Sequence, residues 1–316
     1  MSHFPISIRV LILPKFEAGH LEDDEPGEAK YYYDRYCRGG ERYQLQGCPE
    51  PLYVKDGIAL IVTGMGKVNA AATLSCVLTD PRFDFSKAFF LSTGCGGAAA
   101  QRCVMGDVIL VTSTLDFEFG HTVDARELQD PEGLSWFPDP SMDPFASIRL
   151  NEDLTERIWN LVRTIRPVTT PKTRAAMSRT FAKAPWAMRD PMVLKGTAAT
   201  SDSYWKGPHL QKNAERMAEY YGCPDPYMIS EMEDHAVAAV LQRFHLLDRL
   251  AIIRGATNMD VFMDGSTAEQ HWEIGKHETI VSEESREAVD IFFPAMKNIF
   301  SVGKVIIDAV LEGKLD

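Results

Sequence analysis

The stretch IALIVTGMGKVNAA at residues 58–71 decides the fold class. Ile58 to Thr63 form an apolar run of strand length, Gly64 and Gly66 make a turn, and Lys67 to Leu78 favour a helix. The turn brings backbone N–H groups to the helix start, where they can approach a ligand. It is not a P-loop, because Val68 stands where Ser or Thr would hold magnesium. A tight strand-to-helix turn without a functional role is the alternative.

Short apolar runs alternate with helical patterns on both sides of this unit. The other predicted strands cover residues 6–13, 88–92, 107–113, 193–200 and 250–254. This alternation is typical of βα units around a sheet that binds ligands at its strand ends. We therefore predict a single α/β domain over residues 1–316, with a central mixed sheet flanked by helices and surface excursions near 114–144 and 163–190. Apolar residues from Ala288 to Val310 have the spacing of packing helices.

Composition excludes several classes of protein. The chain has 316 residues, 45% of them hydrophobic and 25% charged, which is typical of a globular protein. A net charge of −12 disfavours nonspecific binding to nucleic acid or to anionic membranes. No apolar run reaches the roughly 18 residues of a membrane span, and the first residues lack a signal-peptide pattern. We expect no membrane span and a cytoplasmic location.

Cysteine and histidine usage predicts no metal site and no disulfide scaffold. The six cysteines form no CxxC pair, although Cys37 and Cys48 could pair if the protein were exported. Five histidines are too scattered for ligand spacing, namely His121, His209, His235, His271 and His277.

Three glycines follow the predicted strand at residues 88–92. The sequence Thr93-Gly94-Cys95-Gly96-Gly97 leaves backbone N–H groups unobstructed by side chains. Such a loop can hold an anion, a ribose or a developing charge. Dense glycine is also compatible with close packing alone.

Hydroxyl, carboxylate and aromatic side chains follow the predicted strand at residues 193–200, in the order Ser201, Asp202, Ser203, Tyr204 and Trp205. Either aromatic ring could stack on a planar heterocycle, a contact worth about 1–3 kcal/mol per base. In the structural alternative, the carboxylate caps the helix that begins near residue 208 and the aromatic rings fill the core.

The segment Ser230-Glu231-Met232-Glu233 precedes an amphipathic helix. Ser230 and Glu233 have the spacing of a capping box, which would explain the glutamate fully. The functional alternative is that Glu233 accepts hydrogen bonds from a ribose diol while Met232 packs on the sugar.

A polar segment also follows the predicted strand at residues 250–254. The amide of Asn258 could bridge the acceptor and donor edge of a purine, with Asp260 close by. Turn chemistry alone would also select Asn and Asp here.

Taken in order, these five segments resemble the nucleoside phosphorylase and nucleosidase superfamily. In this chain the segments read, in order, TGMGKVNAA, STGCGGA, TSDSY, SEMEDHAVA and IIRGATNMD. The corresponding family patterns are, in the same order, G-x-G-K-x-x-A-A, N-T-G-x-x-G-G, S-G-D-x-F, E-M-E and a strand ending before Asp or Asn. The likeness runs from about residue 6 to about 265. It is greatest to the branch labelled purine nucleoside permease, for which we expect chemistry or binding rather than transport.

The resemblance implies an enzyme that cleaves the N-glycosidic bond through an oxocarbenium-like sugar. Glu231, Met232 and Glu233 would hold the ribose. Ser201, Asp202, Tyr204 and Asn258 would bind the base. The loop from Thr93 to Gly97 would face the sugar and the nucleophile. A hydrogen bond from Asn258 would also stabilise the departing purine, which makes Asn258 a catalytic candidate, and Asp260 is a further one.

Two positions depart from the family pattern. Asn258 stands where adenine-cleaving nucleosidases keep an aspartate, and an uncharged amide suits a 6-oxopurine. Leu91 and Gly94 stand where phosphorylases carry an arginine and a serine for phosphate. Water and phosphate therefore both remain open as the attacking group, with phosphate a co-substrate and no other cofactor expected.

Glu17 lies near the position of the nucleosidases' water-activating glutamate, with the register off by about two residues. It is the candidate general base, and a solvated loop carboxylate is the alternative. Relatives complete their site with a neighbouring subunit, so we expect a homo-oligomer. A nucleoside-binding or storage protein without turnover is the other function that the sequence leaves open.

Overall fold

The computed structural model describes residues 4–18, 20–21, 26–130, 133–181, 184–261 and 283–315. His271 and His277 lie outside these ranges, as do the side chains of Ala288 and Ile291.

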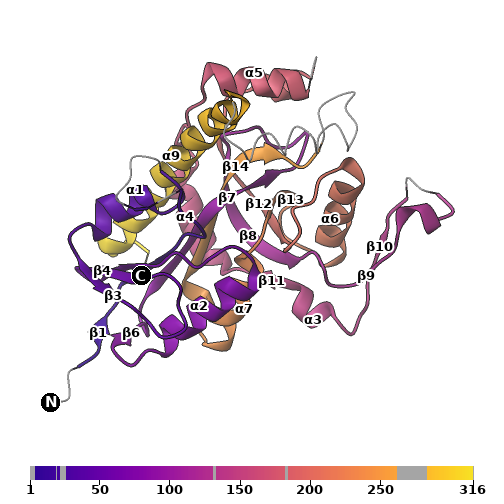
Figure 1. Ribbon diagram of the computed structural model, residues 1–316. Coiled ribbons are helices and arrows are strands. Elements are labelled where there is room, and N and C mark those ends of the chain that lie inside the picture. The colour runs from indigo at the N-terminus through magenta and orange to yellow at the C-terminus, as the bar shows by residue number, and fades with distance from the viewer. Residues whose placement is uncertain are drawn as a thin grey trace.

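Within the described residues, ten strands form one mixed sheet (Figure 1). Its order is β11-β8-β12-β13-β7-β2-β5-β4-β3, and β14 pairs with both β7 and β8. The strands β7, β13, β12, β8 and β14 therefore close into a ring. The bounds are β2 Val10–Leu13, β3 Glu41–Tyr43, β4 Leu52–Lys55, β5 Ile58–Leu60, β7 Phe89–Ala98, β8 Val108–Asp116, β11 Ser147–Arg149, β12 Val193–Thr200, β13 Tyr227–Glu231 and β14 Leu250–Met259.

Smaller elements surround this sheet. Short two-stranded sheets pair β1 Ile6–Ser7 with β6 Phe83–Asp84, and β9 His121–Thr122 with β10 Trp136–Phe137. The α-helices are α1 Lys30–Tyr32, α2 Lys67–Thr79, α3 Asp143–Ala146, α4 Glu152–Val162, α5 Pro171–Thr180, α6 Pro208–Tyr220, α7 Asp234–Arg243 and α9 Glu283–Leu311. A π-helix, η1 Tyr33–Cys37, continues α1, and short 3-10 turns are η2 Ala125–Glu127, η3 Pro185–Met188 and η4 Leu247–Arg249.

The two faces of the sheet bury separate hydrophobic clusters. Leu11 and Leu13 of β2 pack in the cluster that α2 and α7 complete, whereas Val10 and Ile12 pack in the cluster that α4 and α9 complete. This follows from the alternation of side chains along a strand. Helices therefore cover both faces of the sheet, which is why strands such as β2, β5 and β8 are buried along their whole length.

The fold confirms the predicted class, a central mixed sheet flanked by helices. β12 has the predicted bounds, and α2 runs one residue beyond its predicted end. β7 and β14 continue as strands through the segments that we expected to be loops, Gly94 to Gly97 and Gly255 to Asn258. They do so because the two strands pair in parallel along their whole length. β13 was not expected from the sequence.

The predicted surface excursions contain short elements of their own. The first carries the β9–β10 hairpin, which projects from the body of the molecule in Figure 1, together with α3. The second carries α5 and η3. The hairpin is joined to the rest by a third cluster, in which Trp136 packs with Trp205, Met217 and Tyr227.

Candidate active site

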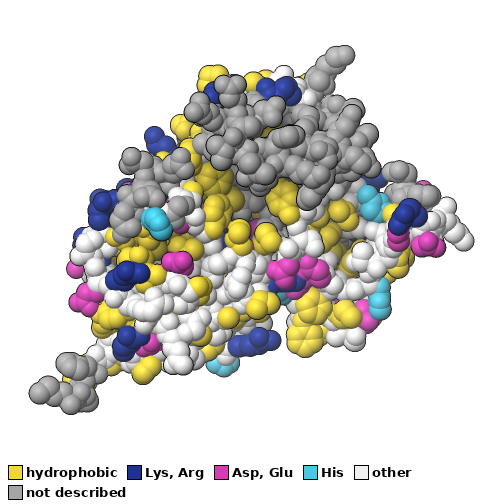
Figure 2. Space-filling view, viewed as in Figure 1, with side chains coloured by type: hydrophobic (Ala, Val, Ile, Leu, Met, Phe, Trp, Pro, Cys, Tyr) yellow, Lys and Arg dark blue, Asp and Glu magenta, His cyan; other side chains and the backbone are white. Residues whose placement is uncertain are grey.

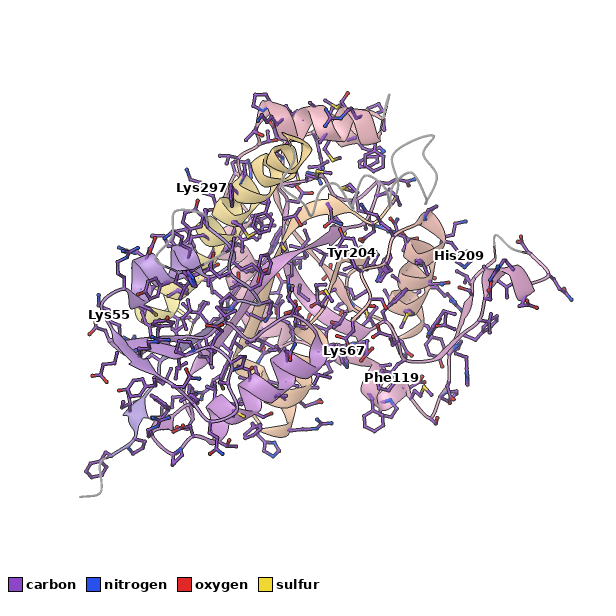
Figure 3. All side chains as sticks on the ribbon, in the orientation of Figure 1. Lys55, Lys67, Phe119, Tyr204, His209 and Lys297 are labelled. Carbon is purple, nitrogen blue, oxygen red and sulfur yellow. The ribbon has the colours of Figure 1, made fainter. Side chains whose placement is uncertain are left out.

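All five sequence segments line one cavity of about 180 Å³. Met65 comes from the glycine turn, residues 95–97 from β7, and residues 203–205 from the loop after β12. Residues 230–233 come from the end of β13, and residues 257, 258 and 260 from the end of β14. Lys15, Phe16 and Glu28 complete the wall. Figure 3 labels Tyr204 in the loop before α6 and Lys67 at the start of α2.

A larger cavity, of about 1090 Å³, opens elsewhere, at the amino ends of β2 and β7. Arg9, Lys87 and Phe89 are among its lining residues. None of the five segments contributes to it. The smaller cavity is therefore the candidate active site.

A buried guanidinium organises the floor of the site. Arg254 of β14 donates through Nε to Asp234 at 2.7 Å, and through Nη2 to Glu231 at 3.1 Å and to Glu233 at 3.0 Å. Its Nη1 donates to the carbonyl of Cys95 at 3.0 Å. Burial disfavours its charged form, yet these carboxylates hold the pKa of Arg254 above its usual value. Three carboxylates thus share one cation.

The second cation, Lys15, is also fully engaged. Its Nζ donates to the Leu13 carbonyl at 2.9 Å and to Ser92 at 2.7 Å, and it lies 3.9 Å from Asp234. Burial lowers the pKa of Lys15. No other lysine or arginine among the described residues lines the cavity.

Glu28 places a buried carboxylate in the cavity wall. One oxygen accepts from the backbone N–H of Lys15 at 2.7 Å and the other from that of Cys95 at 2.7 Å. Burial raises the pKa of Glu28, and Arg254 opposes this rise. A Cβ on Gly94 would come within 2.6 Å of Glu28 Oε1 and 2.7 Å of Arg254 Nη1, so a glycine at this position makes room for both side chains.

Glu17 does not line the cavity. Its carboxylate accepts backbone N–H groups from Ala18, Gly27, Ala29 and Lys30, including bonds of 3.0 Å from Ala29 and 2.7 Å from Lys30. It organises the loop that carries Glu28. The carboxylate that faces the cavity from this part of the chain belongs to Glu28 instead.

Three polar side chains converge over Gly97. Asp260 Oδ1, Ser230 Oγ and Asn258 Nδ2 all lie within 2.9 Å of the point where a Cβ of residue 97 would stand. Asp260 accepts from Ser230 Oγ at 2.7 Å and from the Tyr227 hydroxyl. Burial raises the pKa of Asp260 to about 6 despite these two donors. Gly97 is required here because any side chain would displace this group.

The glycine turn serves the protein's own carboxylates. Gly66, at φ +91°, donates its N–H to Glu233 at 2.9 Å, and the N–H of Lys67 donates to Asp202 at 2.7 Å. Lys67 Nζ binds Asp116 at 2.9 Å and also Glu118. These N–H groups, expected to face a ligand, instead bind Glu233 and Asp202.

Two helix caps that the sequence left open as structural alternatives do not form. Ser230 lies within β13, four residues before α7 begins, so it cannot form a capping box with Glu233. The carboxylate of Glu231 caps α7 instead, accepting the N–H groups of Glu233 and Asp234 at 2.7 Å each. Asp202 caps α2 rather than α6.

The aromatic pair divides between surface and core. Tyr204 is 70% exposed and lines the cavity. Figure 2 shows further hydrophobic side chains exposed across the middle of this face of the molecule. Trp205 is buried and stacks on Phe117, with ring centroids 4.9 Å apart. Ser201 and Asp202 do not line the cavity; the Ser201 hydroxyl donates to Glu118 at 2.6 Å. Met232 lies in the wall between Glu231 and Glu233.

Comparison with known proteins assigns the chain to a family. The sequence profile described as purine nucleoside permease (NUP) matches residues 7–314. The chain belongs to this family. Within the described ranges, no helix is both long and apolar enough to cross a membrane.

Curated relatives carry the same family name. A probable purine nucleoside permease of Schizosaccharomyces pombe is 24% identical over 226 residues, which cover 64% of this chain and 64% of that protein. The purine nucleoside permease of Candida albicans is 24% identical over 215 residues, covering 62% of this chain and 53% of the relative. The chain thus spans less than two thirds of the first relative and about half of the second.

Solved structures share the fold at low identity. A 5′-methylthioadenosine/S-adenosylhomocysteine nucleosidase from Neisseria meningitidis matches with a TM-score of 0.57 and 15% identity, over 95% of this chain and 99% of that one. A futalosine hydrolase mutant of Helicobacter pylori matches with a TM-score of 0.57 and 15% identity, over the same shares. These structures confirm a nucleosidase-like fold.

Sequence reasoning missed Lys15, Glu28 and Arg254. Arg254 gave a usable signal, because an arginine inside an apolar strand needs buried acidic partners. Glu28 gave none, since it follows an acidic stretch of sequence and nothing local distinguishes it from a solvated carboxylate.

Proposed function

We propose that this protein hydrolyses the N-glycosidic bond of purine nucleosides. The observation that carries the proposal is an acidic cavity whose two cations are already engaged by the protein itself. Arg254 is bound by Glu231 and Glu233, and Lys15 is bound by Ser92 with Asp234 nearby. A neutral nucleoside fits such a cavity, whereas an anionic nucleotide would be repelled by it.

The same electrostatics favour water over phosphate as the attacking group. Phosphate sites in proteins offer arginine, lysine or free backbone N–H groups. Here Arg254 faces three carboxylates, Lys15 is bound to Ser92, and the glycine-turn amides are taken by Glu233 and Asp202. Water needs no cation, and a carboxylate can accept its proton.

Glu28 takes the general-base role that we first assigned to Glu17. Its two backbone hydrogen bonds fix its orientation, and each carboxylate oxygen keeps a further lone pair for a water molecule. Glu233, held by Gly66 and Arg254, has remaining lone pairs for a ribose diol. These contacts strengthen as positive charge develops on the sugar.

Asn258 and Asp260 serve the leaving base. A carboxyl with a pKa of about 6 is partly protonated near neutral pH and can donate to a purine nitrogen as the bond breaks. Asn258 lies beside it and can offer both a donor and an acceptor to the base edge. Tyr204 stacks on the base from the exposed side of the cavity.

One assay tests the proposal. The purified protein is incubated with inosine, guanosine, adenosine and uridine, each with and without phosphate, and free base and sugar are separated. Hydrolysis predicts free ribose at a rate that phosphate does not change. Ribose 1-phosphate formed in a phosphate-dependent reaction would contradict it, and tight binding without any product would favour the binding or storage protein.

Replacing Tyr204 with alanine is expected to weaken all purine ligands by a similar factor, about tenfold, because stacking is worth about 1–3 kcal/mol whichever base is stacked. Its exposure predicts little change in thermal stability. Ligand affinity is measured by calorimetry for two purines. Phe145→Ala, another exposed aromatic that does not line the cavity, is the control. Unchanged affinity in Tyr204→Ala would place the base elsewhere.

Asn258→Asp is expected to shift base preference toward adenosine. An amide can donate to one purine nitrogen and meet the 6-oxo group, whereas a carboxylate cannot make both contacts. A wrong hydrogen-bond pattern costs about 1–3 kcal/mol. The ratio of kcat/KM for adenosine to that for inosine should therefore rise about tenfold. A ratio that stays constant would show that another group reads the base.

A further inference from the structure

Two thiols meet away from the cavity, between a loop and the middle of α2. Cys48 lies in the loop 44–51 that joins β3 to β4, and its Sγ is 3.7 Å from the carbonyl oxygen of Thr73 in α2. Cys76 is three residues further along that helix and therefore on the same face. Besides burial, the Cys76 thiol also contributes to raising the pKa of Cys48, as expected for two neighbouring thiols. A Cβ on Gly47 would also come within 2.9 Å of Cys76 Sγ, so the loop lies close to the helix here.

This arrangement differs from the pairing of Cys37 with Cys48 that the sequence left open for an exported protein. Cys37 and Cys48 belong to hydrophobic clusters on opposite faces of the sheet, so they cannot be joined. Cys48 shares its cluster with Cys76, which packs against it while remaining half-buried. Both are free thiols in this structure.

We propose that Cys48 and Cys76 form a reversible disulfide that fastens the loop 44–51 to α2. The oxidant is a low-molecular-weight disulfide of the glutathione class. The thiolate of Cys76 attacks one sulfur of oxidised glutathione, and one glutathione leaves as a thiol after taking a proton. The Cys48 thiolate then attacks Cys76 Sγ and releases the second glutathione. Two protein thiols are oxidised and one glutathione disulfide is reduced.

The order of these steps follows from exposure. Cys48 is 5% exposed, so a bulky oxidant cannot reach it, whereas half-buried Cys76 is accessible. Burial also raises the pKa of Cys48 to about 11, so few Cys48 thiolates exist at neutral pH. Cys76 is therefore the residue that reacts first with the oxidant, and Cys48 is the resolving residue.

The disulfide is expected to stabilise the fold. It would close the chain between residues 48 and 76 and so restrict the unfolded state. We expect Tm to rise by about 3–8 °C on oxidation and to return on reduction. Gly66 is the N-cap of this helix, and its N–H binds Glu233 in the cavity wall. The stabilised helix therefore adjoins the cavity.

The experiment equilibrates the full chain in buffers of increasing oxidised-to-reduced glutathione ratio. Free thiols are then alkylated, the intact mass and the peptide map are recorded, and Tm is measured. We expect two of the six thiols to be lost together and a peptide that links Cys48 to Cys76. Cys37→Ser should behave as the parent does.

Variants that each lack one of the two cysteines distinguish the disulfide from general oxidation of thiols. Cys76→Ser should show no Tm rise and no loss of thiols. Cys48→Ala should stop at a mixed disulfide of glutathione with Cys76. The proposal is overturned if the linked peptide joins another pair, or if the parent also stops at a mixed disulfide on Cys76 while Cys48 remains alkylatable after unfolding.

Discussion

Asp260→Asn is expected to lower kcat by about 100-fold or more, because loss of a general acid costs about 10²–10⁴ in rate. Asparagine has nearly the same shape and can still accept a hydrogen bond from Tyr227 or Ser230, so folding and ligand affinity should change little. The measurement is kcat for inosine, with thermal stability alongside. A loss that appears in KM alone would assign the residue to binding.

The pH profile provides an independent readout of the same residue. Asp260 acts in its protonated form, so activity should fall as the pH rises through about 6, where its raised pKa lies. Glu28 acts in its ionised form, so activity should fall again at lower pH. Asp260→Asn should remove the limb near pH 6 and keep the acidic one.

A matched carboxylate supplies the control. Asp202 caps α2 through Lys67 and does not line the cavity, so Asp202→Asn should keep most of the activity and the full pH profile. If both variants lost activity equally, the effect of Asp260 would have to be assigned to local structure instead of proton donation.

Arg254→Met is expected to lower the free energy of unfolding by about 3–5 kcal/mol, since removing one partner of a buried ion pair leaves the other charge uncompensated. Here Glu231, Glu233 and Asp234 would all lose their shared cation. The free energy is measured by urea unfolding. Arg174→Met, which breaks the exposed pair with Asp190, should cost less than about 1 kcal/mol.

Two further measurements test whether the loss of stability in Arg254→Met comes from uncompensated buried charge. The double variant Arg254→Met, Asp234→Asn should recover part of the loss, because one buried negative charge is removed with the cation. The loss should also be smaller at pH 5 than at pH 7. Burial already raises the pKa of Glu231 to about 7, so lowering the pH lets the folded state bind protons that relieve the repulsion. A loss that is the same at both pH values and in the double variant would point to packing alone.

The sequence by itself determined which five segments meet at the site. Their signals are local: Gly64 and Gly66 adopt positive φ angles at a strand-to-helix turn, and predicted strands precede four of the five segments. Signals of this kind depend only on residues that lie close together in the sequence. For the same reason, the predicted bounds of β12 and α2 lie within one residue of those in the structure.

The tertiary structure decided how those segments are used. Lys15, Glu28 and Arg254 come together from distant parts of the chain, and no local pattern marks their contact. The glycines of β7 stay in a strand because β14 pairs alongside them, and their missing side chains make room for Glu28 and Asp260. Glu231 caps α7 because Ser230 belongs to β13, which continues to Glu231. Hydrogen-bond partners and burial depend on packing between distant segments, so they could not be read from residue spacing.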